Sequence, residues 1–508
     1  MIKQFFGKTT LIALGIIILL WSLALLGYFS NLDVWLLLIV WIVSFGITIK
    51  RLEFGIYLAF IELFSSPHGQ LLSTELGGFV FSLRMCIFSA VLAAWMVSLL
   101  TKKTSMSVSD ERWYWFLPLG LAVMLGIVLG SISNGFPAAF SDGNAYLYLG
   151  YLFPILSVAW TQQHKKDLLQ LLAAGAISIA VFSLCVLYVF SHFDVGVLRA
   201  TYVVLRDLRT VEITNIGAGV YRVFSQIQFF VISFLFLIAG ILFQGNQRWK
   251  EAVGILALMI STVVLSLSRS FWVGLLAATA VFILLVIIKM KPQWKQWGRT
   301  IGQTTTSFFA AIFLILLVAL FPIPTQDLSG SDLADAFAKR AEADDVAVSS
   351  RWNLLTPMVS TILEHPIEGS GFGTAVTFIS DDPRVREISE DGSWSTVSME
   401  WGWLEIWIKM GILAPLGFLY LFYMMTKRLL AYAWTDQAWL GIGLLSGLVF
   451  LYATHFFSPY LNHPIGLGFI LFCIPFLPNK QKVAAQETET INVTLQTKQV
   501  AAATIQTD

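Results

Sequence analysis

The sequence predicts an all-α, polytopic membrane protein with about 12 to 14 transmembrane helices and a large extracytoplasmic loop that contains an amphipathic helix. Of the 508 residues, 57% are hydrophobic and 12% are charged, which is about half the charged share of an average soluble domain. The mean hydropathy is +0.76, and one spanning helix uses roughly 20 apolar residues. This composition excludes an ordinary soluble protein and also a disordered chain, which needs the opposite balance of charge and hydrophobicity.

Candidate spans occur throughout the chain. The run at 53–65 is short and fits either a span or a re-entrant segment. Only Arg269 and its flanking serines separate the runs at 252–268 and 271–289, which we interpret as two helices joined by a tight turn; the alternative is one long kinked helix. In chain order the apolar runs are 9–29, 34–49, 53–65, 79–100, 113–131, 145–160, 168–190, 222–244, 252–268, 271–289, 304–323, 401–426, 438–457 and 465–478.

The basic residues predict the orientation, because cytoplasmic loops of membrane proteins are rich in lysine and arginine. With the N-terminus inside, the pairs Lys50/Arg51, Lys165/Lys166 and Lys427/Arg428 all fall on the cytoplasmic side. Both termini are then cytoplasmic. We expect four parts: a bundle of spans 1–11 over 1–323, the large extracytoplasmic loop over 324–400, spans 12–14 over 401–480, and a disordered cytoplasmic tail over 481–508.

The large outer loop has local order of its own. Apolar residues between 349 and 364 recur at helical spacing, as in Leu354, Met358 and Ile362. We expect an amphipathic helix there, although Pro357 disfavours a helix unless it lies near the first turn. A glycine-rich turn, Gly369-Ser370-Gly371-Phe372-Gly373, follows it.

Charged residues close to the membrane are costly, and their presence calls for an explanation. For Arg199, Arg206 and Arg209 in the segment 191–221, the simpler explanation is that the side chains reach the lipid headgroups. Arg222, expected at the outer end of the eighth span, and Arg269, in the tight turn, are better candidates for a site. Several guanidinium groups on one outer face would suit a phosphate or pyrophosphate, which arginine binds in a bidentate manner.

Acidic and histidine candidates are fewer. Glu400, at the start of the twelfth span, could serve as a general base for a sugar hydroxyl or pair with an arginine, and we favour a structural role for Glu405. His455 and His463, which flank an outer turn, could line a site. The six histidines are scattered and Cys86, Cys185 and Cys473 lie in apolar runs, so we expect no metal site, no cofactor and no disulfide. A net charge of +1 without a basic patch also argues against a nucleic-acid partner.

These motifs, in this order, resemble the O-antigen ligase and O-antigen polymerase family of membrane glycosyltransferases. The resemblance covers about 200–425 and is carried by four short motifs that occur in sequence. They are Tyr221-Arg222-Val223-Phe224-Ser225, Ser268-Arg269-Ser270-Phe271-Trp272, Arg351 through His365-Pro366-Ile367-Glu368-Gly369-Ser370-Gly371, and Trp403-Leu404 to Gly411-Ile412-Leu413.

The resemblance implies a reaction and a location. The donor would be a glycan on undecaprenyl pyrophosphate, and the acceptor a sugar or a lipid-core sugar, on the outer face of a bacterial inner membrane. Arg222 and Arg269 would hold the pyrophosphate without a metal. Many family members have His-Asn where this chain has Glu400-Trp401. Either Glu400 replaces the histidine as the base or the base lies elsewhere, and this difference slightly favours a polymerase over a ligase.

Further residues could touch substrate in such a site, namely Arg84, Arg206, Arg209, Arg351 and His455. Two other functions stay open on the sequence alone. A transporter or flippase would pair charged residues near the bilayer midplane at broken helices, for which only Arg84 and Lys409 are candidates, neither of them near an obvious helix break. A non-catalytic relative, such as a protein associated with bicarbonate transport, would share the core without the reaction.

Overall fold

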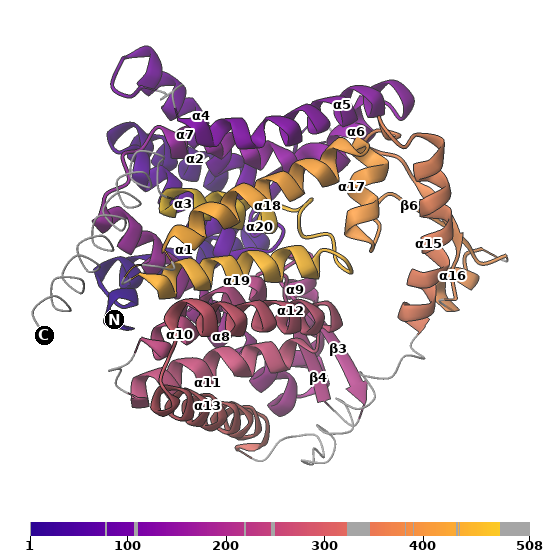
Figure 1. The fold of residues 1–508 in the computed structure, drawn as a ribbon. Helices are drawn as coiled ribbons and strands as arrows, with labels where there is room; N and C mark the ends of the chain where they lie inside the picture. Colours follow the sequence, from indigo (N-terminus) through magenta and orange to yellow (C-terminus); the bar gives the residue numbers. More distant parts are fainter. Residues whose placement is uncertain are drawn as a thin grey trace, which may run out of the picture.

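A computed structural model describes residues 2–76, 79–105, 110–217, 220–244, 249–322, 346–381, 383–389, 391–432, 435 and 437–477. Helices lie side by side through most of it, and three small two-stranded sheets are attached to them (Figure 1). The all-helical, polytopic class predicted from the sequence is confirmed. The predicted tail 481–508 and the first part of the large loop, 324–345, lie outside the described residues.

Eight helices among the described residues are long and apolar enough to cross a membrane, judged by length and composition. Three shorter apolar helices accompany them, and the number of 12 to 14 spans stays a prediction. The eight are α1 (Lys8–Ser30), α2 (Asp33–Lys50), α4 (Leu83–Leu100), the 3-10 helix Glu111–Phe116 with α5 (Leu117–Ser133), α8 (Gln162–His192), α11 (Trp249–Ser266), α12 (Arg269–Leu285) with the π-helical turn Val286–Met290, and α13 (Trp294–Leu320); the shorter three are α10 (Gln228–Phe243), α19 (Ala438–Thr454) and α20 (Pro464–Cys473) with the 3-10 turn Ile474–Phe476.

The remaining helices are shorter or less regular. The run at 53–65 forms a buried helix of 14 residues, α3. The run at 145–160 was expected to span but forms only a 3-10 helix and one short turn of α-helix, because Gly150 and Pro154 disfavour a continuous α-helix. The shorter or less regular helices are the 3-10 helices Ile2–Phe5 and Asn144–Tyr151 and the α-helices α3 (Leu52–Ser65), α6 (Phe136–Gly143), α7 (Leu152–Leu156), α9 (Val195–Asp207), α15 (Val346–Glu364), α16 (Pro383–Arg386), α17 (Gly402–Met410) and α18 (Leu413–Tyr432).

The predicted turn between two helices at Arg269 is confirmed. Helix α11 ends at Ser266 and α12 begins at Arg269. Leu267 between them has a φ of +42°, in the left-handed region that a continuous α-helix does not contain. The alternative of one long kinked helix is therefore excluded.

Aromatic side chains pack beneath the start of α12. Phe271 is fully buried and contacts Phe450 of α19 and Tyr460, with ring centroids 5.4 and 5.8 Å away. Phe229 of α10 contacts the same two rings at 5.4 and 5.9 Å. Such ring pairs add to the free energy gained from burial alone, so that α10, α12, α19 and the loop after α19 form one rigid support.

Within the described residues, three antiparallel strand pairs occur that the sequence analysis did not predict: β1 (Ser73–Leu76) with β2 (Phe79–Ser82), β3 (Glu212–Gly217) with β4 (Val220–Phe224), and β5 (Val376–Ile379) with β6 (Ser393–Thr396). Arg222, expected at the head of a spanning helix, instead lies in β4, and helix α10 begins six residues later, at Gln228. Alternating β-branched and aromatic residues around it favour a strand.

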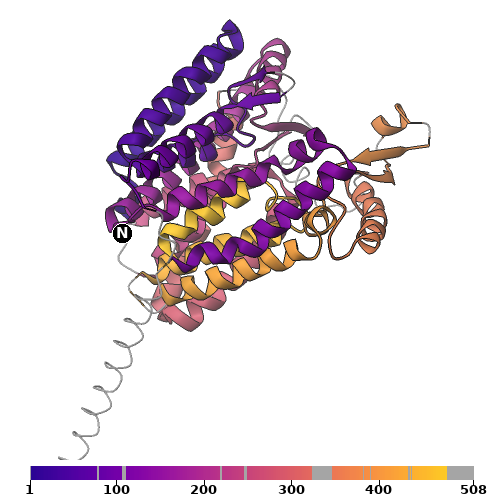
Figure 2. The same ribbon diagram turned by 90° about the horizontal axis from the view of Figure 1, so that it is seen from above.

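The large loop carries the predicted amphipathic helix. Helix α15 contains Pro357 within it and packs its apolar face, with Leu354, Met358 and Ile362, against Met399 and Ile408. Figure 2 shows the part from 346 to 400 gathered at one end of the bundle, away from the N-terminus.

The expected span 401–426 is broken. Helix α17 ends at Met410 and α18 starts at Leu413, and α17 lies beside α15, at an angle to α18 (Figure 1). Gly411, with a φ of +67°, makes the break, and a Cβ at this position would stand 1.9 Å from the Ile367 carbonyl oxygen. Since that carbonyl belongs to the large loop, the loop and the break fit together only through a glycine.

The glycine-rich turn 369–373 is wedged between α5, α6 and α17. Phe372 is buried, its N–H donates to Gly126 O (3.0 Å), and its carbonyl accepts from the Asn134 side chain (3.0 Å). Ser370 N donates to Ile408 O at 2.6 Å. The turn therefore anchors the large loop in the helix bundle.

A buried charge cluster lies next to this anchor. Lys409 Nζ donates to Asp142 Oδ1 (2.6 Å) and to Glu405 Oε1 (2.5 Å), and Asp142 Oδ2 accepts from Gly373 N at 2.8 Å. Glu405 thus pairs with Lys409, in agreement with the structural role that the sequence analysis favours for it. Contrary to our expectation, Lys409 does lie beside a helix break, two residues before Gly411.

Replacing Gly130 by alanine should release the anchor, because a Cβ there would stand 2.3 Å from Phe372 O. Overpacking of this kind costs about 1–3 kcal/mol. We expect a lower unfolding temperature of the purified full-length protein and faster proteolysis within 346–400. Gly120→Ala is the matched control, since it lies on the same helix with nothing within 4 Å of the added Cβ. Equal behaviour of the two variants would contradict the anchoring role.

Candidate functional site

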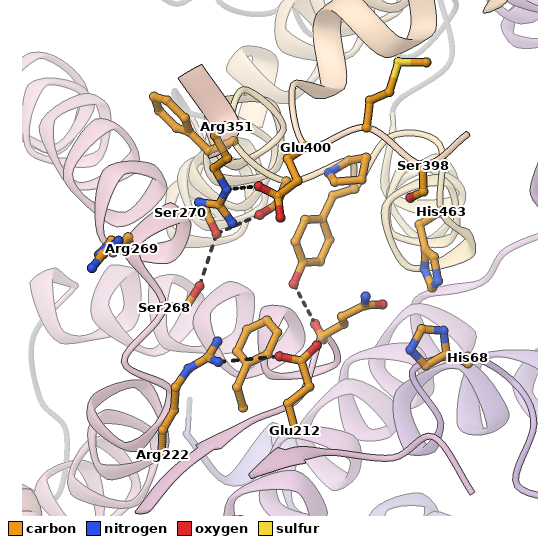
Figure 3. Close-up of a pocket in the computed structure, with 17 residues that line it drawn as sticks. His68, Glu212, Arg222, Ser268, Arg269, Ser270, Arg351, Ser398, Glu400 and His463 are labelled. Atoms are coloured by element: carbon orange, nitrogen blue, oxygen red, sulfur yellow. Dashed lines mark hydrogen bonds and ion pairs between the residues drawn. The ribbon is translucent and has the colours of Figure 1, made fainter. Parts of the chain in front are cut away.

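A polar cavity of about 500 Å³ lies where the large loop meets the helix bundle (Figure 3). Its walls come from the β3–β4 hairpin, the start of α12, the start of the loop helix α15, the residues before α17, and the loop between α19 and α20. Five residues named from the sequence line it: Arg222, Arg269, Arg351, Glu400 and His463. Residues far apart in the chain thus meet in one site.

The first turn of α12 faces this cavity. Ser268, Arg269 and Ser270 all contribute to its wall. Ser270 Oγ lies 3.1 Å from Ser268 Oγ and accepts a hydrogen bond from Ser458 Oγ at 3.0 Å. The N-terminal end of a helix carries partial positive charge, which adds to the charge of Arg269. The turn therefore suits an anion for two independent reasons.

Arg222 reaches the cavity from strand β4. Its Nε donates to Ser266 O at 2.9 Å, at the end of α11, and its guanidinium lies 4.6 Å from the centre of the Phe224 ring. Thr214 stands opposite Arg222 in the hairpin, and Glu212 lies diagonally on the same face. The Glu212 carboxylate is 3.5 Å from Arg222 Nη1. These contacts hold the guanidinium in place at the cavity wall.

Arg351 and Glu400 form an ion pair that joins α15 to the segment before α17. Trp401 Nε1 donates to Arg351 O at 2.8 Å, which fixes the backbone of α15 beside the acid. Both side chains remain partly exposed, at 30% for Arg351 and 50% for Glu400. The large loop thereby contributes one cation to the cavity.

Two histidines form another part of the wall. His68 and His463 are in edge-to-face contact with ring centroids 5.6 Å apart and face each other in Figure 3. Surrounding protein atoms, together with the positive charges of Arg84 and Arg209, lower the pKa of His68 to about 4. His68 is therefore neutral near pH 7, and the positive charge of the cavity comes from arginine.

A second cavity of about 350 Å³ adjoins the first. The two share His68, Glu212, Phe224 and Gln226 as wall residues. Arg206 and Arg209, predicted as further substrate contacts, line this second cavity.

Arg84 lies outside the residues that line these two cavities. Its Nε and Nη2 donate to the buried Glu62 carboxylate at 3.0 and 3.1 Å, and Nη2 and Nη1 donate to the carbonyls of Ser66 and Pro67. A bidentate pair of this kind is geometrically specific. Arg84 therefore supports the segment that carries His68.

His455 is also outside both linings. It is fully buried, its Nδ1 accepts from Leu461 N at 3.1 Å, and its ring packs on Trp403 with centroids 5.2 Å apart. Its position stabilises the loop whose Phe457 and Tyr460 line the main cavity.

Sequence reasoning did not single out Glu212 as a site residue and gave no such role to His68. The hairpin brings Glu212 to the wall, and the only sequence signal for it is the alternation of Ile213 with polar neighbours near Arg222. Nothing local marks His68, because its partner His463 is almost 400 residues further along the chain.

Fold and site together define a polytopic, helical membrane protein with an arginine-lined cavity at one end. Residues 254–419, about a third of the chain, match the family model described as O-Antigen ligase. The predicted resemblance to the O-antigen ligase and polymerase family is thereby confirmed over these residues. The match includes Arg269, Arg351 and Glu400, whereas Arg222 precedes it. No curated protein and no solved structure matches the chain significantly.

The family match indicates a role in cell-surface polysaccharide biosynthesis, in which lipid-linked glycans and acceptors are the general substrates.

Proposed function

We propose that this protein transfers a glycan from an undecaprenyl-pyrophosphate donor to a sugar acceptor in the main cavity, on the outer face of a bacterial inner membrane. The observation that carries the proposal is that Arg222, Arg269 and Arg351 line one cavity together with Glu400. Three guanidinium groups and a helix N-terminus match the charge of a pyrophosphate. The proposed orientation keeps both termini cytoplasmic and the cavity outside.

In the proposed reaction Glu400 takes the proton of the acceptor hydroxyl. The hydroxyl oxygen forms the new bond to the anomeric carbon of the donor, and the bond from that carbon to the pyrophosphate oxygen breaks. Undecaprenyl pyrophosphate leaves with the electron pair. Its growing charge is stabilised by Arg222, which its contacts already position, and by Arg269. The arginines supply the positive charge, and the proposal includes no metal.

Arg351 connects donor binding to the base. Its ion pair with Glu400 occupies a carboxylate oxygen that would otherwise be available to the acceptor hydroxyl. A donor pyrophosphate competes with Glu400 for this arginine. Binding of the donor would therefore free Glu400 for proton transfer at the moment when the acceptor hydroxyl needs it.

The polymerase reaction is our preferred form of the transfer, because Glu400-Trp401 stands where ligases often have His-Asn.

The proposal also includes the division of the chain into a bundle, a loop over 324–400 and terminal spans over 401–480. In it, the loop acts as a lid over the cavity.

One observation favours the alternative of a transporter or flippase. Lys409 is buried with two carboxylates beside a helix break, which is a feature of transporter sites. However, α17 lies beside α15, at the end of the bundle that carries the loop (Figure 1). The cluster anchors the glycine-rich turn there, so a structural role explains it.

The experiment is a transfer assay with purified full-length protein and a labelled undecaprenyl-pyrophosphate oligosaccharide, analysed on a gel. A ladder of longer lipid-linked glycans indicates a polymerase, and product only after addition of a lipid-core acceptor indicates a ligase. Folded protein that gives no product with several donors would overturn the proposal in favour of transport or a non-catalytic role.

A further inference from the structure

We infer that the second cavity is a subsite for a negatively charged group, a carboxylate or a phosphate, on the acceptor. This inference rests on the proposed function, because it assigns the main cavity to the donor. It adds a chemical class for the acceptor: a sugar that carries an acidic group near the reacting hydroxyl.

The position of the second cavity suits an acceptor. Transfer requires the acceptor hydroxyl to lie within about 3–3.5 Å of the donor's anomeric carbon. The two cavities have His68, Glu212, Phe224 and Gln226 in common, so they are immediate neighbours along this wall. A volume of about 350 Å³ also falls within the usual range of about 300–1,000 Å³ for small-molecule sites.

The cations of the second cavity come from the end of α9. Arg206 is oriented by Asp207, whose Oδ1 accepts from its Nε and Nη2 at 3.0 and 2.8 Å, and Asp207 is held in turn by the Tyr28 hydroxyl at 2.9 Å. Arg209 follows at a φ of +49°, and its N–H donates to Arg206 O at 2.9 Å. The chain turns there so that both arginines line one cavity.

The acid in the shared wall does not cancel this charge. The carboxylate of Glu212 pairs with Arg222, which belongs to the lining of the main cavity and not to that of the second. Arginine binds carboxylates and phosphates through paired N–H groups. Arg206 shares its charge with Asp207, 2.8 Å away, so Arg209 supplies the positive charge by which the second cavity favours an anionic group over a neutral hydroxyl.

The test is a binding measurement that needs no donor. Purified full-length protein in phosphatidylcholine vesicles is titrated with cellobiouronic acid and, as the uncharged partner, with cellobiose. We expect the acid to bind about tenfold more tightly, which is about 1.4 kcal/mol, and inorganic phosphate to compete with it. Arg209→Ala and Arg206→Ala should abolish the difference between the two sugars.

Arg199→Ala is the matched control, because Arg199 is an exposed arginine of the same helix and lines neither cavity; it should keep the preference. Equal binding of the two sugars to the wild type, or a preference that survives Arg209→Ala, would overturn the inference. Vesicles that contain phosphatidylglycerol test the other source of phosphate: if this lipid abolishes the preference, the second cavity holds a lipid headgroup and the inference fails. Because binding is measured without transfer, these outcomes are separate from a failure of the proposed reaction.

Discussion

Replacing Arg269 by alanine is expected to lower the rate of glycan transfer by about 10²–10³, the loss that follows removal of one group aimed at transition-state charge. The guanidinium would stabilise the pyrophosphate as it leaves, when its charge is greatest. The N-terminus of α12 would still face the cavity in the variant, so a residual rate should remain. The measurement is the initial rate of product formation by the purified protein at saturating donor.

Arg269→Lys separates charge from geometry. Lysine keeps the positive charge but loses the planar pair of N–H donors, so its rate should lie between those of the wild type and the alanine variant. Arg199→Ala, with an exposed arginine outside both cavity linings, should retain the wild-type rate. An Arg269→Ala protein with an unchanged unfolding temperature and full activity would show that this arginine does not hold the leaving group.

Replacing Glu400 by glutamine should lower kcat by about 10²–10⁴, the usual contribution of a positioned general base. Glutamine has nearly the same shape but cannot take the acceptor's proton. Donor binding should be retained or slightly strengthened, because Arg351 no longer has an anionic partner and is available to the pyrophosphate. The expected signature is therefore a loss in kcat without a rise in KM for the donor.

Two further variants give this experiment its controls. Glu368→Gln changes an exposed glutamate of the same loop that pairs with His365 at 3.0 Å and lies outside the cavity linings, and it should leave kcat unchanged. Glu212→Gln changes the other acid in the main cavity wall. If Glu212→Gln loses activity while Glu400→Gln keeps it, the base is Glu212 and our assignment of Glu400 is wrong.

The link between Arg351 and Glu400 bears on how the large loop contributes to the reaction. Arg351 belongs to α15, which packs on α17 through Met358 and Ile408, and the loop is anchored further on at Phe372. The cation therefore reaches the cavity only while the loop is docked. A loosened anchor, as in Gly130→Ala, should reduce activity as well as stability, although the substituted glycine lines neither cavity.

The sequence by itself determined the class of the protein. Helices form within most of the long apolar runs, because a helix satisfies its backbone hydrogen bonds internally in lipid. Periodic apolar residues likewise predicted α15, and the serines around Arg269 predicted the turn between α11 and α12. The ordered motifs also predicted the family that the match to 254–419 confirms. The signals for the helices and the turn are local, and the family prediction rests on the order of several short motifs along 200–425.

Only the tertiary structure decided what the charged residues do. Arg84 and Arg222 look alike in the sequence, as arginines near the outer end of an apolar run. Yet Arg84 pairs with the buried Glu62, while Arg222 lies in a strand and lines the cavity. The broken helix at Gly411 likewise depends on the Ile367 carbonyl, which arrives from the large loop. The physical reason is that a charge takes its role from partners that desolvate or neutralise it, and here those partners come from distant parts of the chain.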